Sequence, residues 1–124
     1  MDWTLNKSRS IGKQICEKLC VAVASGEFKP GDKLYSVREV ALMAGVNPNT
    51  VQKSFEELAR LGIISSVPSS GWYVSENTAS AHKELEQLKI QSCSDFFESM
   101  ARLGATENDA LDYLMRYKER NDDK

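Results

Sequence analysis

Apolar residues near the start of the chain repeat every fourth position. This period places them on one face of a helix, and such a stripe packs against neighbouring elements of a small domain. The helix follows a candidate capping serine, Ser8 or Ser10, and ends at Gly26. Its predicted buried stripe comprises Ile11, Ile15, Leu19 and Val23.

Two shorter helical patterns follow, separated by a glycine. Ser36 is a candidate N-cap for the first of them, and Glu39 completes a capping box. Gly45 suits the left-handed residue that ends such a helix. Asn47 can cap the second helix, and Pro48 takes its first position, where the missing N–H costs nothing. This order of elements predicts a helix-turn-helix.

Short β-prone runs at residues 63–67 and 72–75 are bounded by Pro and Ser-Gly, which predicts a two-stranded wing and no larger sheet. The expected fold is therefore mainly α. A winged helix-turn-helix DNA-binding domain occupies residues 1–75, and an antiparallel helical hairpin for dimerisation occupies residues 76–124.

The C-terminal segment is predicted to form a long helix that ends at Gly104 and a last helix capped by Thr106. Two helices are too few to bury their own apolar faces, so we expect a homodimer through residues roughly 80–118. The alternative is a monomer in which the hairpin folds back on the first helix. The predicted interface comprises Leu85, Leu88, Phe96, Phe97, Met100, Leu103, Leu111 and Leu114.

The second helix of the helix-turn-helix has one apolar stripe and one polar face. Short polar and amide side chains near the start of such a helix can reach base edges in the major groove of DNA. The alternative is an ordinary solvated helix face. The predicted DNA contacts on this helix are Asn49, Thr50, Gln52 and Lys53.

Three motifs together resemble the winged-helix domain of GntR-type bacterial transcription regulators. They are PGDKL at residues 30–34, GVNPNTV at residues 45–51 and GWYV at residues 71–74. The turn and the short tail are similar to the YtrA-type subgroup, which has a helical dimerisation segment in place of a large effector domain. The resemblance implies DNA contacts by Ser36 and Arg38, and a wing-tip role for Gly71.

The chain departs from the family pattern at two places. Tyr35 stands where the family usually has proline, and the predicted wing, residues 65–72, has no positive charge. Because neutralised phosphates supply much of the affinity for DNA, Arg38 and Lys53 are expected to carry more of it here.

Charge is unevenly distributed along the 124 residues, whose net charge is −2. Residues 1–74 hold 9 basic and 7 acidic side chains, a net charge of +2, whereas residues 75–124 hold 7 and 11, a net charge of −4. The acidic tail would lie away from the DNA. Charge therefore permits nucleic-acid binding but does not itself indicate it.

The remaining chemistry of the chain is sparse. Cys16 and Cys20 lie one helical turn apart. The pair could act as a redox switch or, with His82 as a third ligand, as a metal site. The favoured interpretation is that both are buried free thiols that pack as small apolar residues. No enzyme motif, cofactor motif or metal-ligand pattern occurs. No apolar run approaches a membrane span, and the N-terminus lacks the apolar segment of a secretory signal, so a cytoplasmic location is expected.

Two functions from different classes remain. The first is a sequence-specific DNA-binding transcription regulator, a repressor that acts as a homodimer on a palindromic operator. The alternative is a winged-helix protein-interaction module with lost or weak DNA binding. The sequence identifies no small-molecule effector.

Overall fold

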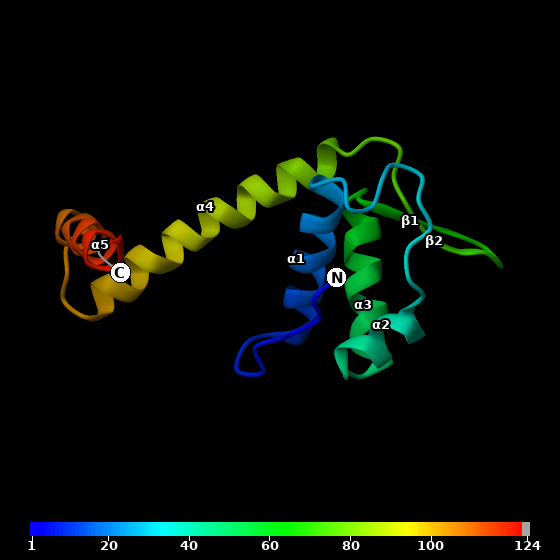
Figure 1. Cartoon of the computed structure of the whole chain (residues 1–124), viewed down its shortest axis with the longest axis horizontal. Helices are drawn as coiled ribbons and strands as arrows, with labels where there is room; N and C mark the ends of the chain where they lie inside the picture. Colours follow the sequence, from blue (N-terminus) through cyan, green and yellow to red (C-terminus); the bar gives the residue numbers. More distant parts are fainter. Residues whose placement is uncertain (123–124) are drawn as a thin grey trace. The chain divides into compact units, whose positions relative to one another are not determined.

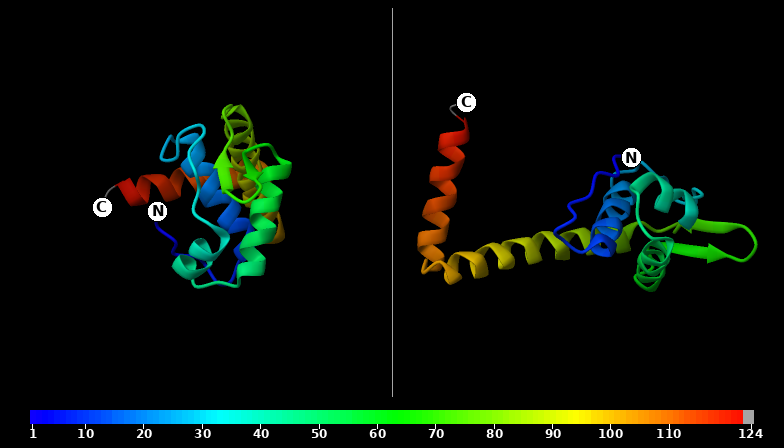
Figure 2. Two further views of the ribbon diagram at one scale, coloured as in Figure 1. Left: turned by 90° about the vertical axis from the view of Figure 1, so that its right-hand side faces the viewer. Right: turned by 90° about the horizontal axis from the view of Figure 1, so that it is seen from below.

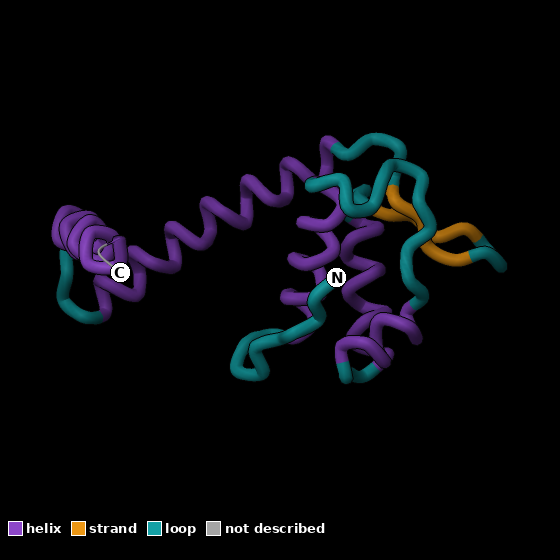
Figure 3. The backbone as a smooth tube through the Cα atoms, in the orientation of Figure 1, coloured by secondary structure: helices purple, strands orange, loops and turns teal. Residues whose placement is uncertain are grey.

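The computed structural model describes residues 1–122 and contains five helices and two strands within that range (Figure 1). The chain divides into two compact units, Met1–Glu86 and the residues from Gln87 onward, and the division falls within one helix. The elements, shown by type in Figure 3, are α1 (Ile11–Ala24), α2 (Val37–Ala44), α3 (Pro48–Arg60), β1 (Ile64–Val67), β2 (Gly71–Val74), α4 (Ala79–Arg102) and α5 (Glu107–Asp122).

The first unit is built on the packing of α1 and α2 against α3. The predicted stripes of these helices form its core, because their largest apolar side chains are almost completely removed from solvent. Trp3, which precedes α1, lies in the same core cluster. The fully buried side chains include Ile15, Leu19, Val40, Val51, Phe55, Leu58, Ile63 and Ile64.

The predicted helix caps are confirmed. Ser10 caps α1, and its side chain accepts a hydrogen bond from the Lys13 backbone N–H. Ser36 and Glu39 form the complete capping box of α2, which ends at Gly45 in a left-handed conformation (φ 68°). Asn47 caps α3. These caps fix where each helix of the helix-turn-helix begins.

The wing is an antiparallel hairpin of β1 and β2, in which Ile64 pairs with Val74 and Val67 pairs with Gly71. Figure 2 shows it projecting from the helices of the first unit. The sheet is slightly larger than expected, because Lys33 forms an isolated bridge with Tyr73. A third segment, residues 32–34, therefore lies along the outer edge of β2.

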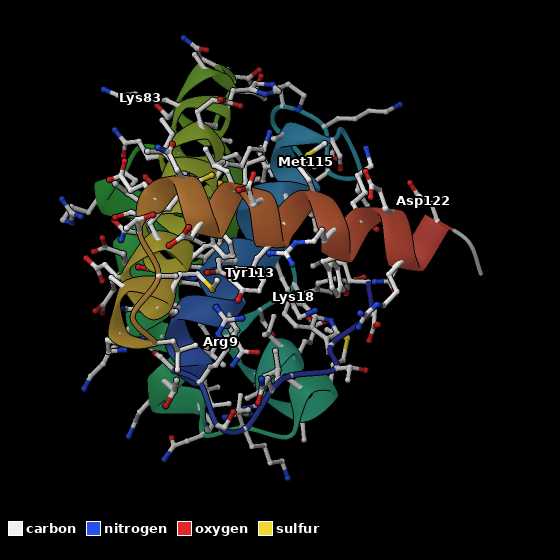
Figure 4. All side chains as sticks on the ribbon, turned by 90° about the vertical axis from the view of Figure 1, so that its left-hand side faces the viewer. Arg9, Lys18, Lys83, Tyr113, Met115 and Asp122 are labelled. Atoms are coloured by element: carbon white, nitrogen blue, oxygen red, sulfur yellow. The ribbon has the colours of Figure 1, made fainter. Side chains whose placement is uncertain are left out.

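The second unit contains the last part of α4 and α5. The turn between them uses Gly104 and a capping box, in which Thr106 and Asp109 each donate a backbone N–H to the other's side chain. Ala110 is buried within this unit, whereas most of its larger apolar side chains are exposed. Tyr113 and Met115, labelled on α5 in Figure 4, are among the exposed ones.

Candidate nucleic-acid interface

The polar face of α3 is exposed, as predicted. Asn49, Gln52 and Lys53 are open to solvent, and Thr50 is half-buried. The opposite face of the same helix is the fully buried stripe of Val51, Phe55 and Leu58. The helix therefore presents amide, hydroxyl and ammonium groups from one rigid element, which is the arrangement that reading of base edges requires.

Ser54 holds α3 firmly against α1. Its hydroxyl oxygen lies 3.0 Å from the carbonyl oxygens of both Gly12 and Thr50. The two helices approach closely here, since a Cβ atom on Gly12 would lie 3.4 Å from the Ser54 hydroxyl. This contact fixes the position of the N-terminal half of α3, where the exposed polar side chains lie.

The acidic residues of α3 lie in its C-terminal half. The Gln52 amide donates a hydrogen bond to the Glu56 carboxylate at 3.1 Å, which orients the amide and leaves its oxygen and one N–H free. Glu57 forms an ion pair with Arg60. The first half of the helix has no negative charge, so phosphate groups would meet no repulsion there.

The start of α2 presents the other two predicted residues. The Ser36 oxygen accepts the Glu39 backbone N–H at 3.0 Å, so the Ser36 hydroxyl proton is still available to donate. In return, the Ser36 backbone N–H donates to the Glu39 carboxylate, and this bond lowers the pKa of that carboxyl. Arg38 is exposed and forms no ion pair within residues 1–122. Its guanidinium is therefore available to a phosphate.

Gly71 lies beside the tip of the wing. The turn consists of Pro68, Ser69 and Ser70, and Gly71 is the first residue of β2, with φ 134°. The next residue, Trp72, packs edge-to-face on the Phe55 ring, with centroids 5.4 Å apart. This contact joins the wing to the buried face of α3.

Sequence reasoning missed Lys33 as a neighbour of the wing, because it precedes Gly71 by 38 positions. Its side chain lies over Gly71: a Cβ atom there would be 3.2 Å from Lys33 Cε and 3.9 Å from Nζ. No local signal in the sequence could have revealed this placement, because one polar residue before one apolar residue is too short a pattern to indicate a strand. The wing hairpin itself has no basic residue, but a positive charge lies beside it.

The Cys16 and Cys20 side chains pack against the core as apolar groups do. The Cys16 and Cys20 sulfurs contact different backbone carbonyls, those of Ser54 and Ala81, and neither thiol forms a disulfide. Burial raises the pKa of Cys16 and raises that of Cys20 to about 11, so both stay protonated. Residues 1–122 contain no cluster of side chains that could hold a metal. No helix in this range is long and apolar enough to span a membrane.

The fold and the exposed face of α3 define a winged helix-turn-helix protein, and comparison with known proteins identifies the family. The model of the bacterial regulatory proteins of the gntR family matches residues 11–74. The chain therefore belongs to the GntR family of transcription regulators and is not an enzyme. The resemblance noted in the sequence is confirmed.

Two relatives come from Bacillus subtilis (strain 168). An uncharacterized HTH-type transcriptional regulator, YhcF, is 32% identical over 119 residues, which cover 96% of this chain and 98% of YhcF. The HTH-type transcriptional repressor YtrA is 47% identical over 84 residues, which cover 68% of this chain and 65% of YtrA. The chain thus resembles small, YhcF- and YtrA-type members of the family.

Solved structures of similar proteins have the same fold. A GntR family transcriptional regulator from Listeria monocytogenes superposes with a TM-score of 0.72 and 29% identity, covering 90% of this chain and 98% of that one. AraR(DBD) in complex with operator ORR3 has a TM-score of 0.51 and 25% identity, covering 52% of this chain and 77% of that one. The second of these relatives is bound to its operator.

Proposed function

We propose that this protein is a sequence-specific DNA-binding repressor that acts as a homodimer on a palindromic operator. The observation that carries the proposal is the face of α3, where Asn49, Gln52 and Lys53 are exposed on a helix whose other side is completely buried. The complex of AraR(DBD) with its operator supports DNA as the ligand.

Residues with different roles are expected to meet different parts of the DNA. Gln52 can form two hydrogen bonds with one adenine, because its amide oxygen and one N–H are free. Lys53 and Arg38 are assigned to phosphates, which fix the position of the protein without reading sequence. Ser36, Asn49, Thr50 and Gly71 complete the proposed contact set.

Dimerisation is proposed from the apolar surface of the second unit. Leu103 is 81% exposed, and Leu111 and Leu114 are about half exposed. Phe96 and Phe97 are half-buried, with their rings in edge-to-face contact. Such a surface is unusual in a monomer and fits burial against a second copy. The remaining proposed interface residues are Leu85, Leu88 and Met100, of which Leu85 also packs against the core of the first unit.

Residues 1–75 are therefore proposed as the DNA-binding part and residues 76–124 as the dimerisation part. Repression is proposed because the relative YtrA is described as a transcriptional repressor. A dimer on a promoter would exclude other proteins from the same DNA. A cytoplasmic location follows from this proposal, because bacterial DNA lies there.

The test is a binding assay on DNA selected by the full chain from a randomised duplex pool. Arg38→Ala and Lys53→Ala should each weaken binding and lower the slope of log Kd against log salt by about 0.9 per protomer. Lys29→Ala, an exposed lysine in the loop after α1, is the matched control and should change neither. If both variants bind as tightly as the wild type, the assignment of these residues is wrong.

A protein-interaction module is the second candidate, and one observation favours it. Leu42 is 78% exposed and Met43 is 44% exposed, so α2 has an uncovered apolar surface within the first unit. If the full chain enriches no DNA from the pool, this second function becomes the better account.

A further inference from the structure

The wing of this protein lacks basic residues in its own hairpin, yet a lysine from elsewhere in the chain lies against it. Lys33 forms a bridge with Tyr73 of β2, and its side chain covers Gly71. No residue between Ser65 and Trp72 is charged. The Lys33 side chain therefore brings an ammonium group next to a hairpin that has no charge of its own.

The backbone around Lys33 is firmly held. The Leu34 N–H donates to the Trp72 carbonyl, and the Val74 N–H donates to the Asp32 carbonyl, each at 2.8 Å. The Leu34 side chain is buried in the core, and the Asp32 carboxylate accepts the Lys29 backbone N–H at 2.7 Å. Lys33 is thus presented from a segment that is hydrogen-bonded to β2 on both sides of it.

The alternation of side chains across the sheet decides which way Lys33 points. Successive residues of a strand face opposite sides, and paired residues face the same side. Trp72 and Val74 face the core, so Gly71 and Tyr73 face outward, and Lys33 shares their side because it pairs with Tyr73. Lys33, Gly71 and Tyr73 therefore share the face of the sheet that is turned away from the core, where Lys33 is exposed and the other two are half-buried.

The nearby acids do not hold the Lys33 ammonium. The charge of Lys33 contributes to the lowered pKa of Glu39, but the Glu39 carboxylate accepts the Ser36 N–H in the capping box. Glu76 lies beside Gly31, and the Asp32 carboxylate is bonded to the Lys29 backbone. Arg9 forms an ion pair with Glu17 and Arg60 forms one with Glu57, and Lys33 is in neither.

We propose that Lys33 contacts a DNA phosphate from the wing and supplies the positive charge that the hairpin lacks. The absence of a Cβ atom at Gly71 leaves the space that the lysine side chain occupies. Ser36 and Arg38 follow Lys33 by three and five residues, so the same segment would link the contacts of α2 with those of the wing. This inference rests on the proposed DNA binding.

The test compares Lys33→Ala with the wild-type full chain on two duplexes of equal length. One is the duplex selected from the randomised pool, and the other has a mixed sequence. We expect the ratio of variant to wild-type Kd to shrink about 3.5-fold per protomer between 50 and 200 mM salt, since one phosphate contact contributes a slope of about 0.9. The change should be similar on both duplexes, because a phosphate contact carries no sequence information.

Two further variants separate charge from structure. Lys33→Arg keeps the charge and should restore the wild-type slope. Lys29→Ala is the matched control, because Lys29 lies in the same segment but farther from the tip of the wing. Gly31, two residues after Lys29, donates its N–H to Val74, at the end of β2 that is farther from the turn. It should leave the slope unchanged.

The outcomes are distinguishable. A Lys33→Ala slope equal to that of the wild type overturns the inference while leaving DNA binding intact, and so does an equal loss in Lys29→Ala. If the wild type itself binds neither duplex, the proposed function fails and this inference fails with it.

Discussion

Replacing Gly71 with alanine tests the geometry of the wing most sharply. Gly71 has φ 134°, a backbone conformation that residues with a Cβ atom rarely adopt. Strain of this kind costs about 1–3 kcal/mol. The new Cβ atom would also lie 3.2 Å from Lys33 Cε, but this atom is near the end of a flexible side chain and can move aside. Backbone strain should therefore dominate the loss.

The assay is thermal unfolding followed by circular dichroism. A loss of about 2 kcal/mol corresponds to a fall in Tm of roughly 8–16 °C for a domain of 60–100 residues. Gly26→Ala is the control, because its φ of 84° lies much closer than that of Gly71 to the left-handed region that residues with a Cβ atom can adopt. Its Cβ position also has no neighbouring atom within 4 Å. We expect Gly71→Ala to be the less stable of the two variants.

The reasoning is refuted if Gly71→Ala is no less stable than Gly26→Ala. The double variant Lys33→Ala/Gly71→Ala distinguishes the two contributions to the loss. If crowding by Lys33 dominates, removing the lysine side chain will restore most of the stability. If backbone strain dominates, the effects of the two substitutions will add within about 0.5 kcal/mol.

Three other predictions concern the cap, the thiols and the second unit. Ser36→Ala removes the N-cap of α2 and should lower the free energy of unfolding by about 1 kcal/mol, as measured by urea titration. In the native protein at pH 8, a thiol reagent should modify the exposed Cys93 rapidly, while Cys16 and Cys20, whose pKa values are raised by burial, should react only as the chain unfolds. If the chain forms the proposed dimer, Leu114→Asp should convert it into a monomer at micromolar concentration, as measured by light scattering; an unchanged mass would contradict the proposed interface.

The sequence predicted the helical part of the first unit well, because its signals are local. Ser36, Gly45, Asn47 and Pro48 each act on the few residues beside them, so their roles can be read without knowledge of the rest of the chain. The stripe of α3 is likewise a periodic pattern within one helix.

The sequence predicted the wing less completely, because its surroundings depend on contacts between distant residues. The place of Lys33 beside Gly71 follows from the pairing of residues 32–34 with β2, and no local signal fixes that pairing. A single exposed lysine before a buried leucine is too short a pattern to indicate a strand. The lack of charge noted in the sequence applies to the hairpin alone, and the lysine beside it was not foreseen.

The central claim is that the exposed face of α3 reads DNA sequence, and selection from a randomised pool tests it most directly. The wild-type full chain should enrich an inverted repeat whose half-sites are separated by one helical turn of DNA or a multiple of it. Gln52→Ala should lose the preference at one position in each half-site, by about 1–3 kcal/mol, and keep the rest of the motif. Enrichment of no motif, or of the same motif by both proteins, would contradict the claim.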